Sequence, residues 1–556
     1  MKKLSSTVRV LMLGLAMTII VPSCVNLDEE LFDAVTPENF FKTPEEFIAA
    51  LGAAYTSLYG YNIGSDVNAL AETSTDEMTV PTRGQDWDDG GHWRRLHLHS
   101  WNWEDPVIGG GWNFGFSGVN NVNRLIFQFN ELVGQGLVSQ TDADAFIAEL
   151  KVLRAFYYYW LLDLYGQVPI VTQFADADPT PASNTRQQVF DFVASELNEN
   201  VPKLSQAVDG STYGRMNYWA GKAIQAKLYL NAGVYTGTPR WAETIAACDE
   251  IINSGRYSLE ANFFINFNLN SEVSKEIIFA IPFDKVFAQG FVLPMRTLHY
   301  GSQDTYNLTA QPWNGFCSLE EFYNSFEDDD VRKGDAGTLT GPAQRRGSFV
   351  AGFQYKSNGE PVVDSGYEPG LDLDGPQLNF TPQISQIGPG ALRQQGVRIG
   401  KWEFEIGGTP DMSNDLAVFR LADIMLMKAE ALWRQSQNPA QGEALALVNQ
   451  VRSRAAVSDL STLDGPVSFD ITGPVVPGGE LLNERGREMF AEGFRRQDLI
   501  RWGLFTSVDK WALPIGNPGD RIETGAFTNL YPIPRGQKDA NPNLQQNPGY
   551  PGGGPG

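Results

Sequence analysis

An apolar stripe at helical spacing constrains the fold of this chain more than any other feature of its sequence. Between Asp142 and Tyr165, apolar residues recur at alternating steps of four and three: Phe146, Leu150, Leu153, Tyr157, Trp160 and Leu164. This spacing puts them on one face of an α-helix, which must pack against other elements to be covered. We expect Thr141 or Asp142 to cap the helix and Gly166 to end it.

The same period predicts further helices in the first half of the chain and in its C-terminal third. The expected helices cover 44–59, the stretch from Gly109–Gly111 to about 131, 186–200, 217–233, 241–254, 419–435, 440–454 and 479–495. On the helix at 217–233, Ala223 and Ala226 fall on the buried face, so a neighbouring helix can approach closely. Stacked antiparallel pairs in tetratricopeptide-like arrays pack in this way. Because no clean repeat of about 34 residues is present, we predict a mainly α-helical fold built from degenerate pairs.

The amino-acid composition and the apolar pattern of the chain change between residues 257 and 406. Gly, Pro, Asn and Asp become frequent there, and apolar runs shorten, as at 276–281. We interpret this part as a loop-rich insertion with short strands inside a helical scaffold of residues 40–256 and 407–510. An extended segment follows at 511–556. Its tail from Asn541 is rich in Pro, Gly and Asn and is expected to be extended over the surface or disordered.

The first residues have the pattern of a bacterial lipoprotein signal peptide. Lys2, Lys3 and Arg9 precede an apolar run at 10–21, which is short for a membrane span but suits a signal peptide. Residues 21–24 (VPSC) then resemble a lipobox, which implies cleavage after residue 23 and a lipid on Cys24. An ordinary secretory peptide with a chance cysteine is the alternative. The acidic residues at 28–30 resemble a signal for export to the cell surface.

Charge and cysteine content exclude several classes of protein. The formal net charge is −24, so the chain lacks the basic face that nucleic-acid binding requires. After Cys24 only Cys248 and Cys317 remain, in unlike contexts, and they do not indicate a disulfide framework. No later segment has 18 consecutive apolar residues, so we expect a body outside the membrane that is anchored by its lipid.

A tryptophan-dense stretch at 80–103 is the leading candidate for ligand binding. Trp87 and Trp93 lie in a run of Asp, Gly and His that is not typical of an amphipathic helix. A flat indole beside carboxylates and guanidinium groups suits a sugar ring, because the indole covers the C–H face and the charged neighbours bind hydroxyls. The alternative is that these tryptophans belong to the core, which applies most to Trp101 and Trp103.

Three sets of motifs resemble those of the SusD/RagB family. The first is RAFYYY at 154–159 followed by LYGQVP at 164–169; the second is ERGREMFAEGFR at 484–495 with Asp498, Leu499 and the sequence RWG at 501–503. The third is YPIP at 531–534 with NPNL at 541–544 and QNPGY at 546–550. With the lipobox, these matches span nearly the whole chain in the order of the family.

The resemblance implies a fold and a function. The fold would be an α-helical superhelix of tetratricopeptide-like pairs, forming one SusD-like domain over residues 24–556. The protein would be a lipoprotein on the outer face of the outer membrane. It would act as a lid on a SusC-like TonB-dependent transporter, capture oligosaccharides or polysaccharides and deliver them to it. It would be a binding component and not an enzyme.

Within the second motif, Glu484, Glu488 and Glu492 recur every four residues near several arginines. We interpret them as a structural charge network that fixes one helix against the body, not as a catalytic pair.

For a glycan site we expect Trp87 to be the main stacking platform, supported by Trp93. In part of the family, a tryptophan in a run like DWDDGG lies at the glycan site. Asp86 or Asp66 would accept hydrogen bonds from hydroxyl groups. In the family, the insertion often supplies aromatic side chains that contact the ligand. Here it contains several aromatic residues: Tyr300, Tyr306, Trp313 and Phe316. Tyr306 or Trp313 would form a second platform, and Arg398 would donate to sugar oxygens.

Metal and cofactor sites are weakly indicated. His97 and His99 share a face in an extended chain, but no third ligand is evident. Asp372 and Asp374, or the acidic run at 327–330, are rich enough in oxygen for a structural calcium ion, yet neither completes an EF-hand pattern. We expect no cofactor.

Other functions remain open from the sequence. An oligopeptide-capturing lid and a structural lid with little affinity of its own are the main alternatives. A hydrolase is disfavoured, because no Gly-x-Ser-x-Gly elbow, His-Glu-x-x-His motif or P-loop is present. A glycosidase would require two carboxylates at a set separation, and no pair is marked out.

Overall fold

The apolar stripe lies on helix α6 (Gln140–Leu164), the helix around which the scaffold is built. In this computed structural model, residues 44–334, 347–364, 376–440, 442–506 and 525–553 are described. Every residue from Val152 to Leu164 is buried, so α6 is covered on all sides over its C-terminal half. The cap is Ser139, two residues before the expected position, because its side chain accepts the amide of Asp142 at 3.1 Å.

Helix α5 (Pro106–Gly134) packs along α6 and differs from the expectation at its start. It begins at Pro106, so the glycine cluster lies inside the helix instead of before it. Close packing requires some of the glycines of this helix. A Cβ on Gly111 in the cluster would lie 2.6 Å from Leu70 Cδ1 and 2.7 Å from the Tyr165 hydroxyl oxygen. A Cβ on Gly115 would lie 2.5 Å from Leu161 Cγ, and a Cβ on Gly118 would lie 2.5 Å from the ring of Tyr157.

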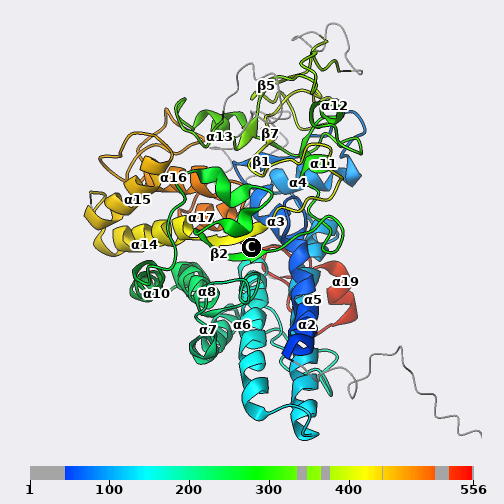
Figure 1. Cartoon of the computed structure of the whole chain (residues 1–556), viewed down its shortest axis with the longest axis vertical. Coiled ribbons are helices and arrows are strands. Elements are labelled where there is room, and N and C mark those ends of the chain that lie inside the picture. The colour runs from blue at the N-terminus through cyan, green and yellow to red at the C-terminus, as the bar shows by residue number, and fades with distance from the viewer. Residues whose placement is uncertain (1–43, 335–346, 365–375, 441, 507–524, 554–556) are drawn as a thin grey trace, which may run out of the picture. The chain divides into compact units, whose positions relative to one another are not determined.

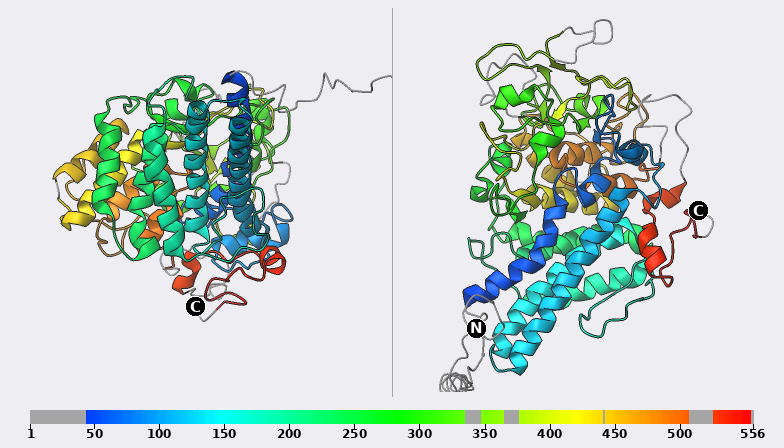
Figure 2. Two further views of the ribbon diagram at one scale, coloured as in Figure 1. Left: turned by 90° about the horizontal axis from the view of Figure 1, so that it is seen from below. Right: turned by 90° about the vertical axis from the view of Figure 1, so that its right-hand side faces the viewer.

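The remaining long helices extend this layer. They are α7 (Arg186–Asn200), α8 (Tyr218–Leu230), α10 (Trp241–Asn253), α14 (Leu421–Ser436) and α15 (Gly442–Arg454). Contacts run from α5 through α6 to α7, and from α8 through α10 and α14 to α15. Seen from below, these helices stand side by side (Figure 2). The expected helix at 217–233 is divided, because α8 ends at Leu230 and the short α9 (Ala232–Thr236) follows.

A two-stranded antiparallel sheet joins the loop-rich part to this layer. Strand β2 (Ile277–Ile281) arises from the short apolar run at 276–281 and pairs with β8 (Leu416–Arg420). Helix α14 follows β8 directly, so the expected helical start at 419 is wrong: residues 419 and 420 belong to the strand. All residues of both strands are buried, which removes the alternation that identifies a strand in sequence.

The region 257–406 contains short elements. They are η4 (Phe263–Phe267), η5 (Ser271–Val273), α11 (Leu293–Thr297), α12 (Ser302–Tyr306), β3 (Cys317–Ser318), α13 (Glu320–Asn324), β4 (Phe349–Val350), β5 (Gly352–Phe353), β6 (Asn379–Phe380) and β7 (Arg398–Ile399). Antiparallel pairs form between β4 and β7, between β5 and β6, and between β3 and the N-terminal β1 (Met78–Thr79). In Figure 1 the labelled members of this set, α11, α12, α13, β5 and β7, lie in the upper part of the picture with β1 and α4 (His92–His97).

The other N-terminal elements are short. They are α2 (Pro44–Tyr55), η1 (Thr56–Tyr61), α3 (Asp66–Glu72) and η2 (Asp89–Gly91). A further short helix, η3 (Val201–Lys203), follows α7. The chain divides by its contacts into Met1–Phe47 and Ile48–Gly556, and the layer of long helices and the loop-rich region both belong to the second unit. The expected signal peptide, Cys24 and the acidic run at 28–30 lie outside the described residues. Within the described ranges, no helix combines the length and apolar character needed to span a bilayer.

The expected helix at 479–495 is two helices, α16 (Gly479–Met489) and α17 (Arg495–Arg501). The chain breaks between them because Ala491 and Gly493 adopt left-handed backbone angles, with φ of 63° and 94°.

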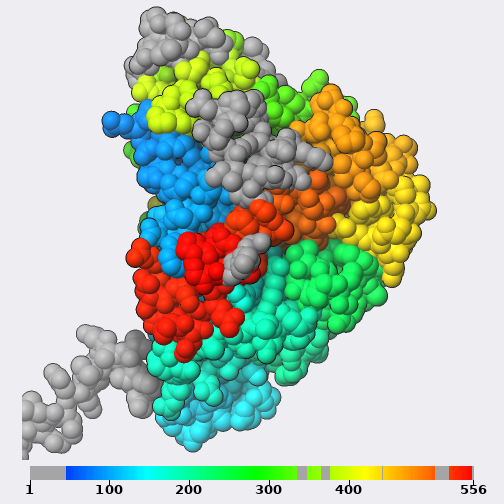
Figure 3. Space-filling model, turned by 180° about the vertical axis from the view of Figure 1, so that it is seen from behind, coloured from blue at the N-terminus to red at the C-terminus, as the bar shows by residue number. Residues whose placement is uncertain are grey.

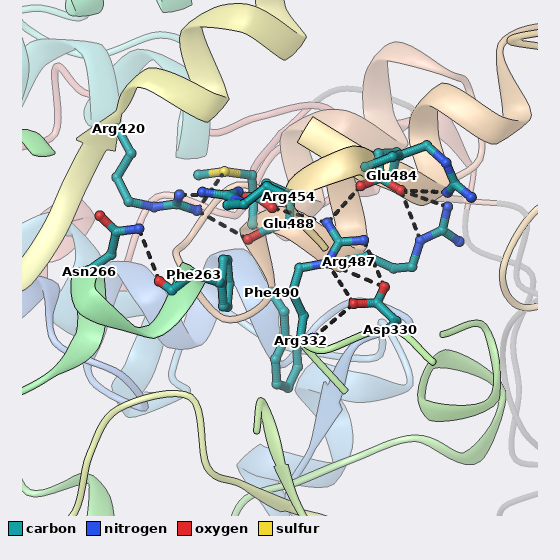
Figure 4. Close-up of polar contacts among 12 residues, drawn as sticks. Phe263, Asn266, Asp330, Arg332, Arg420, Arg454, Glu484, Arg487, Glu488 and Phe490 are labelled. Carbon is teal, nitrogen blue, oxygen red and sulfur yellow. Dashed lines mark hydrogen bonds and ion pairs between the residues drawn. The ribbon is translucent and has the colours of Figure 1, made fainter. Parts of the chain in front are cut away.

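The expected charge network is confirmed around α16 (Figure 4). Arg332 from the loop-rich region donates to Glu484 at 2.6 Å and to Glu488 at 3.0 Å. Arg420 and Arg454 also bind Glu488, and these side chains are buried. A buried array of this kind joins segments far apart in sequence.

The C-terminal segment is packed onto the body where it is described. It contains η7 (Ala526–Asn529) and α19 (Arg535–Ala540), and Figure 3 shows it running over the surface. Asn547 is buried and donates to the carbonyl oxygens of Tyr165 at 2.9 Å and Tyr531 at 2.7 Å. The hydroxyl of Tyr550 accepts from Trp101 Nε1 at 2.7 Å. Over residues 541–553, the tail is therefore extended and fixed, and the alternative of disorder is wrong there.

Candidate ligand-binding site

Three segments far apart in sequence meet around Trp87: residues 80–95, 295–317 and 387–398. The amide of Thr82 donates to the carbonyl of Ile387 at 2.8 Å, which joins the first segment to the third. The amide of Trp313 donates to the carbonyl of Met295 at 2.7 Å, which folds the second segment back on itself. In Figure 1 the helices and strand of these segments, α4, α11 and β7, lie near one another.

Trp87 is the central ring of the site. Its indole Nε1 donates to the carbonyl oxygen of Trp313 at 2.7 Å, and its ring is half-buried. Trp93 and Phe316 contact it edge to face, with ring centroids 5.9 and 5.3 Å away. The backbone of Trp87 is left-handed, with φ of 58°, which is uncommon for a bulky residue and marks a position held by its surroundings.

Trp313 presents the most open aromatic surface of the site. Its side chain is 45% exposed, and its ring centroid lies 6.3 Å from that of Trp87, with the ring planes 49° apart. Trp93 on α4 is 7% exposed, and Phe316 is fully buried. Trp313 with the open part of Trp87 thus forms an aromatic platform, and the other two rings support it from below.

A polar strip lies on one flank of the platform. The hydroxyl of Tyr300 donates to the carboxylate of Asp86, and the guanidinium of Arg393 lies over the Tyr300 ring at 5.9 Å. Arg393 also approaches Asp364 at 3.8 Å. The strip thus offers a carboxylate acceptor and a guanidinium donor at the surface, the two groups that bind sugar hydroxyls.

The charges near the platform are mostly paired. Arg94 bonds Asp88 at 3.0 Å, and Arg95 bonds Asp105. The remaining carboxylate of this stretch, on Asp89, accepts from Trp93 Nε1 at 2.9 Å. Paired charges leave no strong field of one sign, which favours a neutral ligand.

Asp66, an expected hydrogen-bond acceptor, is only indirectly connected to the platform. Contacts run from Trp87 to Phe316, then to the guanidinium of Arg296 at 5.8 Å from the Phe316 ring, and from Arg296 to the Gly64–Ser65 turn beside Asp66. Burial raises the pKa of Asp66, and Arg296 partly opposes the rise. The structure brings the side chains of Trp87, Trp93, Asp86 and Trp313 together. Asp66 is not part of this group and is connected to it only through Arg296 and Phe316.

Tyr306 and Arg398 do not face the platform with open surface. Tyr306 on α12 is 5% exposed and packs edge to face on Phe404, with centroids 5.2 Å apart. Arg398 is fully buried and donates to Asn314 Oδ1 at 2.7 Å and to the Arg393 carbonyl at 2.6 Å. Burial lowers the pKa of Arg398. The sequence predicts that both contact a ligand. In the structure, Tyr306 instead packs on Phe404, and Arg398 hydrogen-bonds Asn314 and the backbone.

Sequence reasoning missed two arginines, Arg393 and Arg83. Arg393 lies five residues before Arg398 in the same irregular run, where no period shows which side chain points outward. Arg83 precedes the DWDD run and is buried, which charge alone does not predict.

The weak metal candidates have other partners where they are described. In the acidic run, Asp330 binds Arg332 at 2.8 Å and Glu327 binds Arg452 at 2.5 Å. His99 is buried with Nε2 2.7 Å from the carbonyl of Ser74. Among the described residues, no group of three or more His, Cys, Asp or Glu could hold a metal ion. Asp372 and Asp374 lie outside them.

Comparison with protein families gives two matches that together span more than half of the chain. A model described as "SusD family" matches residues 393–550, and one described as "Starch-binding associating with outer membrane" matches residues 30–230. The starch-binding protein SusD of Bacteroides thetaiotaomicron is 27% identical over 459 residues, 76% of each chain. SusD-like protein P25 of Formosa agariphila is 22% identical over 510 residues, 87% of each chain.

Solved structures share the fold. A laminarin-binding SusD-like protein has a TM-score of 0.65 at 19% identity and covers 92% of this chain and 100% of its own. Surface glycan-binding protein A from Bacteroides thetaiotaomicron, in complex with laminarihexaose, has a TM-score of 0.67 at 21% identity and covers 91% of this chain and 99% of its own. The expected mainly helical, tetratricopeptide-like fold is confirmed. SusD-like family members are binding proteins and not enzymes, and the two family models, the SusD homologue and the shared fold together support a SusD-like family protein.

Proposed function

We propose that the chain is a surface glycan-binding lipoprotein that captures oligosaccharides on the platform of Trp313 and Trp87. The observation that carries this proposal is the 45% exposed indole of Trp313, held beside Trp87 and flanked by a carboxylate and a guanidinium. The relatives named for starch and laminarin binding support a glycan as the ligand.

The expected contact energies predict weak, reversible binding of the glycan. Stacking a sugar ring on an indole contributes about 1–3 kcal/mol by area, and ordering of the sugar offsets part of it. Several such contacts with hydrogen bonds to Asp86 and Arg393 correspond to a dissociation constant of about 1 μM or weaker. A lid that must release its ligand requires affinity in this range.

The cellular setting extends the proposal. A lipid on Cys24 would tether the protein to the outer membrane, where it would deliver oligosaccharides to a SusC-like TonB-dependent transporter. The family resemblance supports this setting, as does the description of outer-membrane association for the model matching residues 30–230. Loss of palmitate labelling in Cys24→Ala, and co-purification of the wild type with an outer-membrane transporter, are the expected results.

Affinity electrophoresis tests glycan capture. Native gels containing amylopectin, laminarin, xylan or galactomannan are run with wild type, Trp313→Ala and Trp87→Ala. We expect at least one glycan to retard the wild type and both variants to lose most of the retardation. Phe287→Ala is the matched control, because Phe287 is an aromatic residue that is 93% exposed outside the site.

Three results would contradict the proposal. Retention of full retardation by Trp313→Ala would place the glycan elsewhere. Absence of retardation on every glycan, together with heat of binding when oligopeptides are titrated, would favour a peptide-capturing lid. Absence of both would favour a structural lid.

A further inference from the structure

We propose that Gly315 and Arg83 are positioning residues: they hold the Trp87 indole against residues 313–315 and so fix Trp313 before a ligand arrives. This inference rests on the proposed function for its consequence, since a platform matters only if something binds to it. The local geometry that it claims can be measured without a ligand.

Gly315 is required for space. A Cβ at this position would lie 2.6 Å from Trp87 Cζ2 and 2.7 Å from the carbonyl oxygen of Arg296, closer than real Cβ atoms come to other atoms. Gly315 is not among the residues with positive φ, so its backbone conformation would admit alanine. The indole of Trp87 therefore lies where any side chain at 315 would have to be.

The position of Trp87 is fixed from several directions at once. Its N–H donates to the Trp313 carbonyl, its ring meets Phe316 edge to face, and its backbone is left-handed. Uncommon backbone conformations persist where the surroundings over-determine them, and they cluster at sites that bind ligands. Because the indole N–H is used on Trp313, Trp87 acts partly through its neighbour.

Arg83 fixes the irregular segment that carries Trp313 through hydrogen bonds to its backbone. Its buried guanidinium donates to the carbonyls of Asn314 at 2.9 Å and Gly315 at 2.8 Å, and to that of Gln395 at 2.7 Å. In the described part of the chain, Arg83 forms no ion pair with a carboxylate, so its donors serve backbone oxygens of the two segments beside the platform and, at 3.5 Å, Cys317 Sγ. Arg398 bonds Asn314 on the same segment. A planar guanidinium with several donors suits this role, whereas a lysine has only a point charge.

The test is an NMR measurement on protein labelled with ¹⁵N in the tryptophan indoles. The Trp87 signal is assigned by its loss in Trp87→Phe. In wild type we expect this indole N–H to exchange slowly with solvent, because it is hydrogen-bonded at 2.7 Å despite its half-buried ring. In Gly315→Ala we expect a shifted Trp87 signal and faster exchange, with most other indole signals unchanged.

Gly388→Ala is the matched control. Gly388 lies in the third segment, lacks a positive φ, and a Cβ there would meet only Gln386 Oε1 at 3.6 Å, an ordinary contact. We expect its Trp87 signal to match the wild type. Thermal melts show whether Gly315→Ala is folded. If it is not, Arg83→Lys is measured in its place, and we expect a shifted Trp87 signal with faster exchange.

A Trp87 signal that is unmoved in a folded Gly315→Ala or in Arg83→Lys would overturn the inference. So would fast exchange of this N–H in the wild type. For a glycan that retards the wild type, we expect Gly315→Ala to lose about tenfold in affinity, since a loosened site binds less well. If no glycan binds yet the signals behave as expected, the glycan function fails and the positioning stands.

Discussion

Two arginines five residues apart show how the site depends on single side chains. The Arg393 side chain is 39% exposed and its guanidinium lies beside Tyr300, whereas Arg398 is buried among backbone carbonyls and Asn314. A surface group is free to bind a ligand. A buried one with several acceptors holds the structure instead.

Exchange of each arginine for alanine should separate these roles. Arg393→Ala should weaken glycan binding several-fold and change the free energy of unfolding by less than about 1 kcal/mol, since exposed ion pairs contribute little. Arg398→Ala should lower the free energy of unfolding by about 2 kcal/mol or more, because it leaves buried acceptors unpaired. Calorimetric titration and urea unfolding measure the two effects. Equal loss of stability in both variants would refute the distinction.

A buried carboxyl pair, Glu72 and Glu77, is a second feature at the scale of residues. Glu72 accepts from the amides of Gly493 and Phe494, and burial raises its pKa to about 7. Burial also raises the pKa of Glu77, and the Glu72 charge adds to the rise. The folded protein thus retains a proton that the unfolded chain releases above its usual pKa of about 4.3.

This proton gives stability a defined dependence on pH. Because the folded state binds more protons between about pH 4.5 and 7, the free energy of unfolding should fall as the pH rises through this window. Glu72→Gln keeps an acceptor for the two amides and removes the titration, so its slope should be shallower than that of the wild type. Urea unfolding at several pH values measures the slopes. Identical slopes would show that Glu72 carries no such proton.

At the scale of elements, α5 and α6 depend on glycine at their contact. Gly118→Ala should lower the free energy of unfolding by about 1–3 kcal/mol, because the new methyl group overlaps the Tyr157 ring. Gly109 lies in the same helix with no atom within 4 Å of a Cβ. Gly109→Ala should therefore stabilise by up to about 1 kcal/mol through helix propensity. Denaturant unfolding of both variants gives the test, and the same sign of change in both would contradict it.

The elements also show what sequence can reveal. Helical period located α6, α7, α10 and α15 to within a few residues, because apolar residues recur at helical spacing in each of them. It failed at β8, where every side chain is buried and no alternation is visible. It also failed between α16 and α17, where the left-handed turn at Ala491 depends on tertiary contacts. The tryptophan run indicated the place of the site, but which neighbours share its surface depends on segments about 200 and 300 residues away in sequence.

At the scale of the whole molecule, the buried charge network around α16 connects the loop-rich region to the helices. Neighbouring guanidinium groups hold the pKa of Glu484 down to about 2 and the pKa of Glu488 well below its usual range, against the opposing effect of burial. Carboxylates with lowered pKa values stabilise the fold above the usual pKa of about 4.3. That stability is lost as the pH falls toward the folded pKa.

Acid and mutation should act on this network in the same direction. The free energy of unfolding should decrease below about pH 4.5 and continue to decrease toward pH 2. At pH 7, Glu488→Gln should cost about 3–5 kcal/mol, because Arg332, Arg420 and Arg454 would lose a buried counter-charge. Thermal melts across pH measure both. A variant as stable as the wild type at pH 7 would show that the network does not hold the body together.

A crystal structure with bound oligosaccharide tests most directly where a glycan lies, using a fragment of whichever polysaccharide retards the wild type most. We predict a sugar ring against the exposed face of Trp313, with hydroxyls bonded to Asp86 or Arg393. A sugar bound elsewhere with Trp313 uncovered, for example in the cavity of about 570 Å³ beside Tyr213 and Tyr257, would contradict the proposed site.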